Sequence, residues 1–188
     1  MRPIIVTAFM SLDGVMEAPG GEPGHRSSGW TFKDIELDPA AYELKGREQE
    51  EAGALLVGRT SYEAFAPVWP SMTEEFPGYN VMPRYVVSTT LEQEDPRWPA
   101  TILRSLDEVA ALKESDGGPI IVHGSATLGH GLADAGLVDR YHLLVFPVLL
   151  GAGKRLFSDA DKDKQPLEVV ESQTYRNGIT KIVADVRR

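Results

Sequence analysis

The chain has 188 residues, of which 42% are hydrophobic and 25% are charged, a balance typical of a soluble globular protein. This length predicts a single domain over residues 1–188, and the composition excludes wholesale disorder, collagen and a coiled coil. The net charge of −9 argues against a nucleic-acid-binding protein. The absence of cysteine excludes disulfides and thiolate chemistry, which fits a cytoplasmic protein.

Short β-branched and aliphatic runs alternate with segments of helical character along the first two thirds of the chain. In chain order, the predicted elements are strand Pro3–Phe9, helix Pro39–Glu51, strand Ala54–Val57, helix Thr60–Ala66, strand Tyr85–Val87, helix Ser105–Glu114, strand Ile120–Val122 and helix Ser125–Ala135. Capping-box patterns open the helices at Thr60 and Ser105, and Ser125 is the predicted cap of the last one. Continuous apolar strands between helices indicate a parallel sheet covered on both faces.

The last third of the chain predicts antiparallel structure. A long strand over Asp139–Val148 is followed by two further runs, Leu167–Tyr175 and Ile179–Val186, which flank Arg176-Asn-Gly178. An Asn-Gly pair between two such runs is a strong hairpin signal. The fold class is therefore α/β: a three-layer α/β/α domain with a mostly parallel mixed sheet and a C-terminal antiparallel hairpin. The longest apolar run, Leu143–Leu150, is too short to span a bilayer, so we expect no membrane partner.

Two strand-to-helix turns are candidate anion sites. Gly58 and Arg59 follow one buried strand, and His123-Gly-Ser125 follows another. Glycine lets the backbone approach a phosphate, a helix N-terminus favours negative charge, and a guanidinium can bind phosphate in a bidentate manner. An ordinary connection with solvated side chains is the alternative reading of each turn. Two such turns at the carboxyl ends of parallel strands are more informative than one.

Several acidic residues are candidates for handling a proton. Asp13 follows the first strand in Ser11-Leu-Asp-Gly14, while Asp34 and Glu36 follow Trp30. Burial beside an aromatic ring would raise the pKa of such a carboxyl group, and we rank Asp13 first. A simple Asp-Gly turn and an acidic first helical turn are the structural alternatives.

Two glycine-rich loops could border a ligand. Glu17–Gly29 contains four glycines and predicts a mobile lid over the substrate. Pro147–Phe157 ends a strand with two glycines followed by Lys154 and Arg155, and it could line a pocket or form a flexible turn. The four histidines lack the spacing of metal ligands, so we predict no metal site.

Taken in order, these motifs resemble the dihydrofolate reductase superfamily, and most closely the stand-alone relatives of the reductase domain of riboflavin biosynthesis. The motifs that carry the resemblance are Ser11-Leu-Asp-Gly14, Trp30 after a glycine-rich loop, Val57-Gly-Arg-Thr60, Val86-Val-Ser-Thr89, Val122-His-Gly-Ser125 and Pro147-Val-Leu-Leu-Gly-Ala-Gly153. They span nearly the whole chain. The resemblance implies NADPH as hydride donor and a homodimeric assembly.

The resemblance also implies roles for individual residues. Contacts to the cofactor phosphates are implied for Gly58, Arg59 and Thr60, a place near the adenosine 2′-phosphate for Ser88 and Thr89, and a pyrophosphate cradle for Gly124, Ser125, Ala126 and Thr127. Substrate contacts are implied for Ser11, Trp30, Leu150 and Gly151. In folate reductases an acid follows the tryptophan at a fixed spacing in the sequence. Here Asp34 and Glu36 lie on either side of that position, and neither falls on it.

The sequence leaves two main hypotheses open. The first is an NADPH-dependent reductase that acts on a pterin-like or pyrimidine-like heterocycle, such as dihydrofolate or a ribosylaminouracil phosphate. The second is a non-catalytic NADP(H)-binding protein of the same fold, and a nucleotide-binding protein without redox chemistry is a weaker third. Turnover of NADPH with a panel of pterins and pyrimidines separates the first hypothesis from the others.

Overall fold

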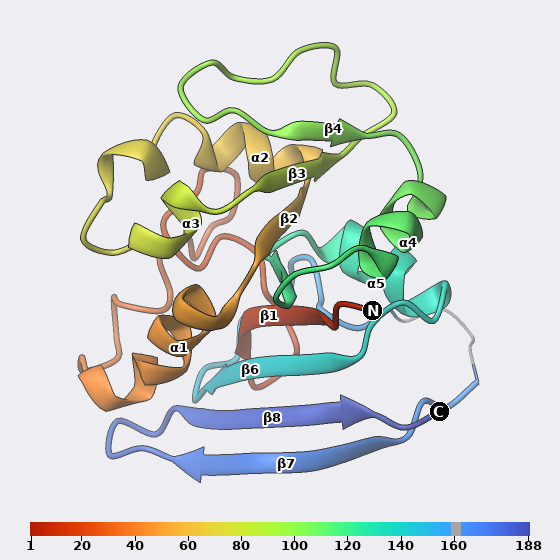
Figure 1. Cartoon of the computed structure of the whole chain (residues 1–188). Coiled ribbons are helices and arrows are strands. Elements are labelled where there is room, and N and C mark those ends of the chain that lie inside the picture. Colours follow the sequence, from red (N-terminus) through yellow and green to blue (C-terminus); the bar gives the residue numbers. More distant parts are fainter. Residues whose placement is uncertain (159–162) are drawn as a thin grey trace.

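A computed structural model describes residues 1–158 and 163–188, and a mixed sheet forms its centre (Figure 1). Among these residues the sheet has eight strands in the order β4-β3-β2-β5-β1-β6-β8-β7. The strands are β1 (Ile4–Ser11), β2 (Ala54–Gly58), β3 (Arg84–Val87), β4 (Thr101–Leu103), β5 (Ile120–His123), β6 (Arg140–Phe146), β7 (Leu167–Thr174) and β8 (Thr180–Val186). Neighbours from β4 to β6 pair in parallel, whereas β8 is antiparallel to both β6 and β7. The predicted mostly parallel sheet with a C-terminal hairpin is confirmed.

Helices cover both faces of the sheet and make the three predicted layers (Figure 1). The helices are α1 (Glu43–Glu51), α2 (Arg59–Phe65), α3 (Pro77–Val81), α4 (Leu106–Glu114) and α5 (Ala126–Asp134), with 3₁₀ turns at Pro39–Tyr42 and Trp69–Ser71. Successive side chains of a strand point to opposite faces, so Ile4 and Val6 pack with α4 and α5 while Ile5 packs with α2 and α3. Continuous apolar strands are therefore buried on both sides.

The chain direction changes between β1 and β5, which are neighbours in the sheet. The chain leaves β1 towards β2 on one side, and it leaves β5 through α5 towards β6 on the other. Open α/β sheets bind ligands beyond the carboxyl ends of strands at such a reversal. The ends of β1 and β5, at Ser11 and His123, therefore mark the switch point of this sheet.

Two predicted side-chain caps of helices are wrong. The first residue of α2 is Arg59, its N-cap residue is Gly58, and no side chain caps it, so Thr60 lies inside the helix. Ser125 is the N-cap residue of α5, as expected, but its side chain does not cap the helix, because its backbone is left-handed, with φ 66°, and its hydroxyl bonds Gly58 and Ser61. The predicted cap of α4 is confirmed, because Ser105 Oγ accepts the Glu108 N–H at 3.3 Å. The short strand β4 and the one-turn helix α3 were not predicted.

We expect Ser105→Ala to lower the free energy of unfolding by about 1 kcal/mol, since it removes the side-chain acceptor at the start of α4. Urea unfolding followed by circular dichroism measures this change. Ser172→Ala on the exposed strand β7 is the control and should change stability by less than half as much. Equal effects of the two substitutions would contradict a capping role for Ser105.

Candidate functional site

One hydroxyl group joins the two turns that the sequence marks as anion sites. Ser125 Oγ accepts the Gly58 N–H at 2.9 Å and donates to Ser61 Oγ at 2.8 Å. This bond brings the end of β2 against the end of β5 at the switch point. Gly124 has a φ of +63°, a left-handed conformation that glycine adopts without strain. A Cβ atom at this position would also lie only 3.4 Å from Ser61 Oγ.

Two arginines lie near the carboxyl ends of β2, β3 and β4. Arg59 pairs with Glu63 at 2.9 Å and donates to Thr90 Oγ1 at 2.7 Å, with about half of its side chain exposed. Arg104 donates to the carbonyl of Ser88 at 2.9 Å. Ser88 is buried, and its hydroxyl accepts the backbone N–H groups of Thr90 and Leu91.

The loop that carries Thr89 is therefore stabilised by the Ser88 side chain, and Thr89 itself is exposed. The two guanidinium groups lie beside this loop, with Arg59 paired to Glu63 and Arg104 bonded to backbone carbonyls. Beyond the end of β5, Ala126 and Thr127 form the first turn of α5, where Ala126 is buried and Thr127 is exposed.

Asp13 binds the loop after β6 to the end of β1. Its carboxylate accepts the Ser11 hydroxyl at 2.6 Å and the backbone N–H groups of Leu150 and Gly151 at 3.1 and 2.8 Å. These bonds, with the Ser11 hydroxyl foremost, lower the pKa of Asp13 to about 2. The raised pKa that we expected for a proton donor is not found here, because every one of these partners favours the charged carboxylate.

The segment after Trp30 carries its two acids on the surface of the protein. Trp30 is buried, its indole N–H donates to the Glu17 carbonyl at 2.8 Å, and its ring packs edge-on against Phe146. Asp34 and Glu36 are exposed. Trp30 therefore anchors the preceding loop in the core, and the two carboxyl groups point to solvent.

The glycine-rich loop Glu17–Gly29 is tied to the loop after β6. The ring of His25 bonds the Ala152 carbonyl at 2.8 Å, Arg26 donates to the Leu150 carbonyl at 3.2 Å, and Glu17 accepts the Lys154 N–H at 2.8 Å. The predicted lid is thus a loop with defined contacts in this structure. The two loops cover the same end of β1.

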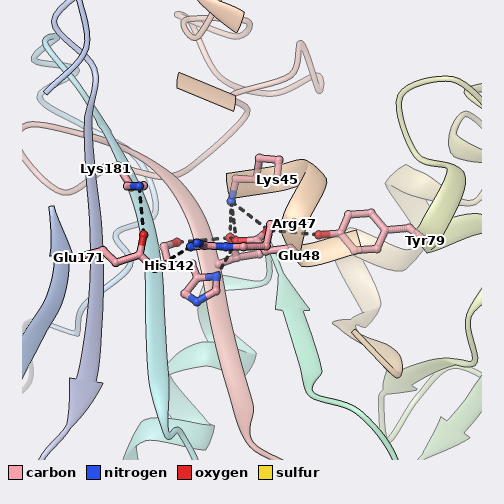
Figure 2. Close-up of polar contacts among 8 residues, drawn as sticks. Lys45, Arg47, Glu48, Tyr79, His142, Glu171 and Lys181 are labelled. Carbon is pink, nitrogen blue, oxygen red and sulfur yellow. Dashed lines mark hydrogen bonds and ion pairs between the residues drawn. The ribbon is translucent and has the colours of Figure 1, made fainter. Parts of the chain in front are cut away.

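A buried polar network, which no motif of the sequence indicates, lies around Glu48. Thr7 of β1 pairs in register with His123 of β5 and with His142 of β6, so the three residues form one row across adjacent strands. Glu48 of α1 lies over this row with its carboxylate fully buried. It accepts the Thr7 hydroxyl at 2.7 Å and bonds His142 Nδ1 at 2.9 Å (Figure 2).

Two further side chains complete the shell around this carboxylate. The Lys45 ammonium lies 3.4 Å from both oxygens, and the Tyr79 hydroxyl donates at 3.3 Å (Figure 2). Burial alone raises the pKa of Glu48, but the Lys45 charge and the bonds from His142 and Thr7 bring it well below its usual range. Glu48 therefore remains ionised within the protein interior.

His123 is enclosed by aromatic side chains beside this network. Its ring packs edge-on against Phe65, Trp69 and Tyr79 with centroid distances of 5.2 to 5.9 Å. Burial, with the Lys45 charge adding to it, lowers the pKa of His123 to about 3. Within the described chain its Nδ1 atom is buried without a hydrogen-bond partner. A neutral histidine therefore directly precedes the turn at Gly124.

A family model described as the RibD C-terminal domain matches residues 2–181. The chain belongs to the RibD C-terminal domain family. A relative in Bacillus subtilis (strain 168), the uncharacterized protein YyaP, is 28% identical over 188 residues, which cover 97% of this chain and 94% of YyaP.

Solved structures confirm the dihydrofolate reductase-like fold of this family member. A Shewanella sp. PV-4 protein, provisionally named for riboflavin biosynthesis, aligns over 100% of both chains with a TM-score of 0.73 and 21% identity. A pyrimidine reductase-like protein of Corynebacterium diphtheriae aligns over 100% of this chain and 92% of its own, with a TM-score of 0.68 and 15% identity. Dihydrofolate reductase from Enterococcus faecalis, complexed with NADP(H) and RAB-propyl, aligns over 99% and 97% with a TM-score of 0.62 and 14% identity.

The resemblance read from the sequence is therefore confirmed at the level of family and fold. No helix within residues 1–158 and 163–188 is long and apolar enough to cross a membrane. In the same residues no three His, Asp or Glu side chains are grouped as metal ligands.

Asp13→Ala should free the backbone N–H groups of Leu150 and Gly151, because it removes the carboxylate that accepts both. We expect amide exchange of these two residues to become about tenfold faster or more, since a hydrogen bond to a charged group is worth roughly 1.5–3 kcal/mol. Hydrogen–deuterium exchange resolved by NMR measures this effect. Asp34→Ala on the exposed segment is the control. Unchanged exchange in Asp13→Ala would show that the Asp13 carboxylate does not hold the loop at Leu150 and Gly151.

His123 should make the folded state less stable as the pH falls. The unfolded chain takes up a proton on this ring below its ordinary pKa of 6.5, whereas the folded protein does so only near 3. The stability contributed by neutral His123 is therefore complete above pH 6.5 and is lost progressively as the pH falls towards 3. Urea unfolding between pH 7.5 and 4.5 should show this loss.

His123→Phe keeps an aromatic ring among Phe65, Trp69 and Tyr79 and should flatten that pH dependence. His130→Gln on α5 is the control and should keep the slope of the unsubstituted protein. If the slope of His123→Phe equals that of the unsubstituted protein, His123 does not titrate as a buried neutral ring.

Proposed function

We propose that the protein is an NADPH-dependent reductase that transfers a hydride to a pterin-like or pyrimidine-like heterocycle. The observation that supports this most directly is the Ser125 hydroxyl, which joins the Gly58 and Gly124 turns at the switch point of the sheet. Membership of the RibD C-terminal domain family and a neighbour in complex with NADP(H) support the same reading.

The residues at the two turns fit a dinucleotide. In the described chain α5 begins without a side-chain cap, so its first N–H groups remain available to an anion. Gly124 leaves no Cβ in this turn, and Thr127 is exposed at the start of the helix. When bound, NADPH supplies the hydride, while this chain binds its phosphates through Gly58, Arg59, Thr60, Gly124, Ser125, Ala126 and Thr127.

The edge of the sheet at β2 and β3 carries two arginines that suit a 2′-phosphate. The Arg59 guanidinium is half exposed, and Arg104 lies across the loop of Ser88 and Thr89. Arginine binds phosphate through two parallel hydrogen bonds, so this edge favours NADPH over NADH. The Ser88 hydroxyl holds the loop that presents Thr89 and Thr90 to the phosphate.

The substrate is proposed to lie beyond the end of β1. The contacts proposed for Ser11, Trp30, Leu150 and Gly151 differ in access: Ser11, Trp30 and Leu150 are buried and would support the walls of the site, whereas Gly151 is exposed and would face the substrate. The role proposed for Asp13 is to hold that loop in place, because its carboxylate bonds both loop N–H groups and has a low pKa. Exposed Asp34 and Glu36 are second choices as proton donors.

The second candidate function is NADP(H) binding without catalysis. It is supported by the same turns together with the absence of a protonated carboxyl at Asp13. NADPH binding without oxidation by any member of a panel of dihydropterins and aminopyrimidines would favour it. For either function we propose a cytoplasmic homodimer, which sedimentation equilibrium can test.

Arg59→Ala should weaken NADPH binding by about 10- to 100-fold and leave NADH binding nearly unchanged. The expected size follows from one charge-assisted hydrogen bond, worth roughly 1.5–3 kcal/mol. Quenching of tryptophan fluorescence measures both affinities.

Arg97→Ala is the matched control, because Arg97 is exposed and pairs with Asp95 away from the two turns. If the protein binds NADPH and NADH with equal affinity, or if Arg59→Ala has no effect, the 2′-phosphate assignment is wrong.

A further inference from the structure

Lys45 lies on the side of the buried network that faces the end of β1. Its ammonium donates to Thr7 Oγ1 and lies 5.0 Å above the centre of the Phe9 ring. Phe9 is two residues beyond Thr7 on the same face of β1, and the strand ends at Ser11. Lys45 is therefore the member of the network that lies against Phe9, towards the proposed substrate.

The ammonium of Lys45 is only partly satisfied by the protein. It has three N–H bonds, and within the described residues its acceptors are Thr7 Oγ1 and the Glu48 carboxylate. About 12% of the side chain is exposed, so Lys45 reaches the surface of the network, whereas the Glu48 side chain is fully buried. The two contacts to the Glu48 oxygens are long, at 3.4 Å each, so an acceptor atom of a ligand competes with them for an N–H bond of the ammonium.

Neither the Glu48 nor the Asp13 carboxylate is available to bind a substrate group at the end of β1. Glu48 is sealed beneath Lys45, and the carboxylate of Asp13 already accepts two backbone N–H groups and a hydroxyl. Lys45 is thus the polar group that the buried network itself directs to this side, and an ammonium donates hydrogen bonds and never accepts them. Such a group pairs with a carbonyl oxygen, and it repels an amino-substituted ring that is protonated at a ring nitrogen.

We propose that Lys45 is a specificity-determining residue of the site, which donates a hydrogen bond to an acceptor atom of the bound heterocycle and selects oxo-substituted over amino-substituted rings. This inference rests on the proposed function for the location of the substrate. Burial lowers the pKa of the Lys45 ammonium, and the charge and hydrogen bond of Glu48 oppose that change.

Glu48 is the positioning residue of this arrangement. Its carboxylate holds Lys45 over Phe9, and Thr7, His142 and Tyr79 fix the carboxylate in turn. A free lysine side chain samples many rotamers. The hydrogen bonds from the Lys45 ammonium to Thr7 and Glu48 restrict it to a few of them. The preference for an acceptor on the ligand should therefore depend on both Lys45 and Glu48.

Two probes of the same skeleton test the inference directly. In 5,6-diaminouracil two ring positions carry oxygen, and in 2,4,5,6-tetraaminopyrimidine the same positions carry amino groups. Calorimetric titration of the full chain, with and without NADPH, should give at least tenfold tighter binding of the uracil. Lys45→Met should reduce this preference by about tenfold or more, and Lys45→Arg should retain most of it.

Arg47→Met is the matched control, because Arg47 lies on the same helix but pairs with Glu171 on β7 (Figure 2). It should keep the preference of the unsubstituted protein. Lys45→Met leaves the buried Glu48 carboxylate without its ion-pair partner. The double variant Lys45→Met/Glu48→Gln removes both charges and so leaves no unpaired buried charge. Circular dichroism and thermal unfolding select the variants that are folded.

A folded variant without Lys45 that keeps the preference overturns the inference. So does a stronger affinity for the tetraamine, or binding of neither probe by the unsubstituted protein. Failure of the reductase proposal is recognised separately, because it appears as missing NADPH binding or missing NADPH oxidation while the difference between the two probes can persist.

Discussion

The buried carboxylate of Glu48 is the constraint on which the arrangement of this molecule depends. Helix α1 has the sequence Glu-Leu-Lys-Gly-Arg-Glu-Gln-Glu-Glu, and Leu44 is its single buried apolar residue. The hydrophobic effect alone therefore holds this helix weakly against the sheet. Hydrogen-bond donors from β1, β6 and α3 bind the Glu48 carboxylate and hold the helix where its single apolar contact would not be enough. A buried charge requires all of its partners, so the network fixes where α1 can lie.

The same carboxylate connects the supporting structure with the candidate site. Its partner Thr7 pairs in register with His123 of β5, and His123 directly precedes the Gly124 turn. Ser125 then joins that turn to the end of β2. Helix α1, the central strands and both candidate phosphate turns thus share one set of short contacts. A substitution that breaks any of these contacts is expected to change the structure at the end of β1, where the proposed substrate lies.

The sequence was sufficient for most of the sheet because its central strands are continuous apolar runs bounded by glycine, proline or polar residues. It was insufficient for β4, since Thr101–Leu103 is short and lacks such a run. The caps at Thr60 and Ser125 failed for a related reason. A capping pattern reports only local bonding, and the Ser125 hydroxyl instead bonds Gly58 and Ser61, far away in the chain.

The network around Glu48 could not be read from the sequence. In a segment as charged as α1, each Glu and Lys looks like part of a solvated face. Only the register of β1 with β6 brings Thr7 and His142 beneath one of them. The loop residues were partly predictable, because Asp13 was singled out at the end of β1. Its partners at Leu150 and Gly151 come from a loop that the sequence placed nearby without showing the bond.

The central position of β1 has a consequence for biosynthesis. Ile4 pairs with Ile120, and Ile5 pairs with Arg140, so both neighbours of this strand are made long after it. During translation β1 leaves the ribosome as an apolar segment with no partner to pair with. The sheet can close only when β5 and β6 have followed, which makes folding of the core late and dominated by distant contacts. A nascent chain of this kind is expected to depend on chaperones that shield its first strand until β5 and β6 have been made.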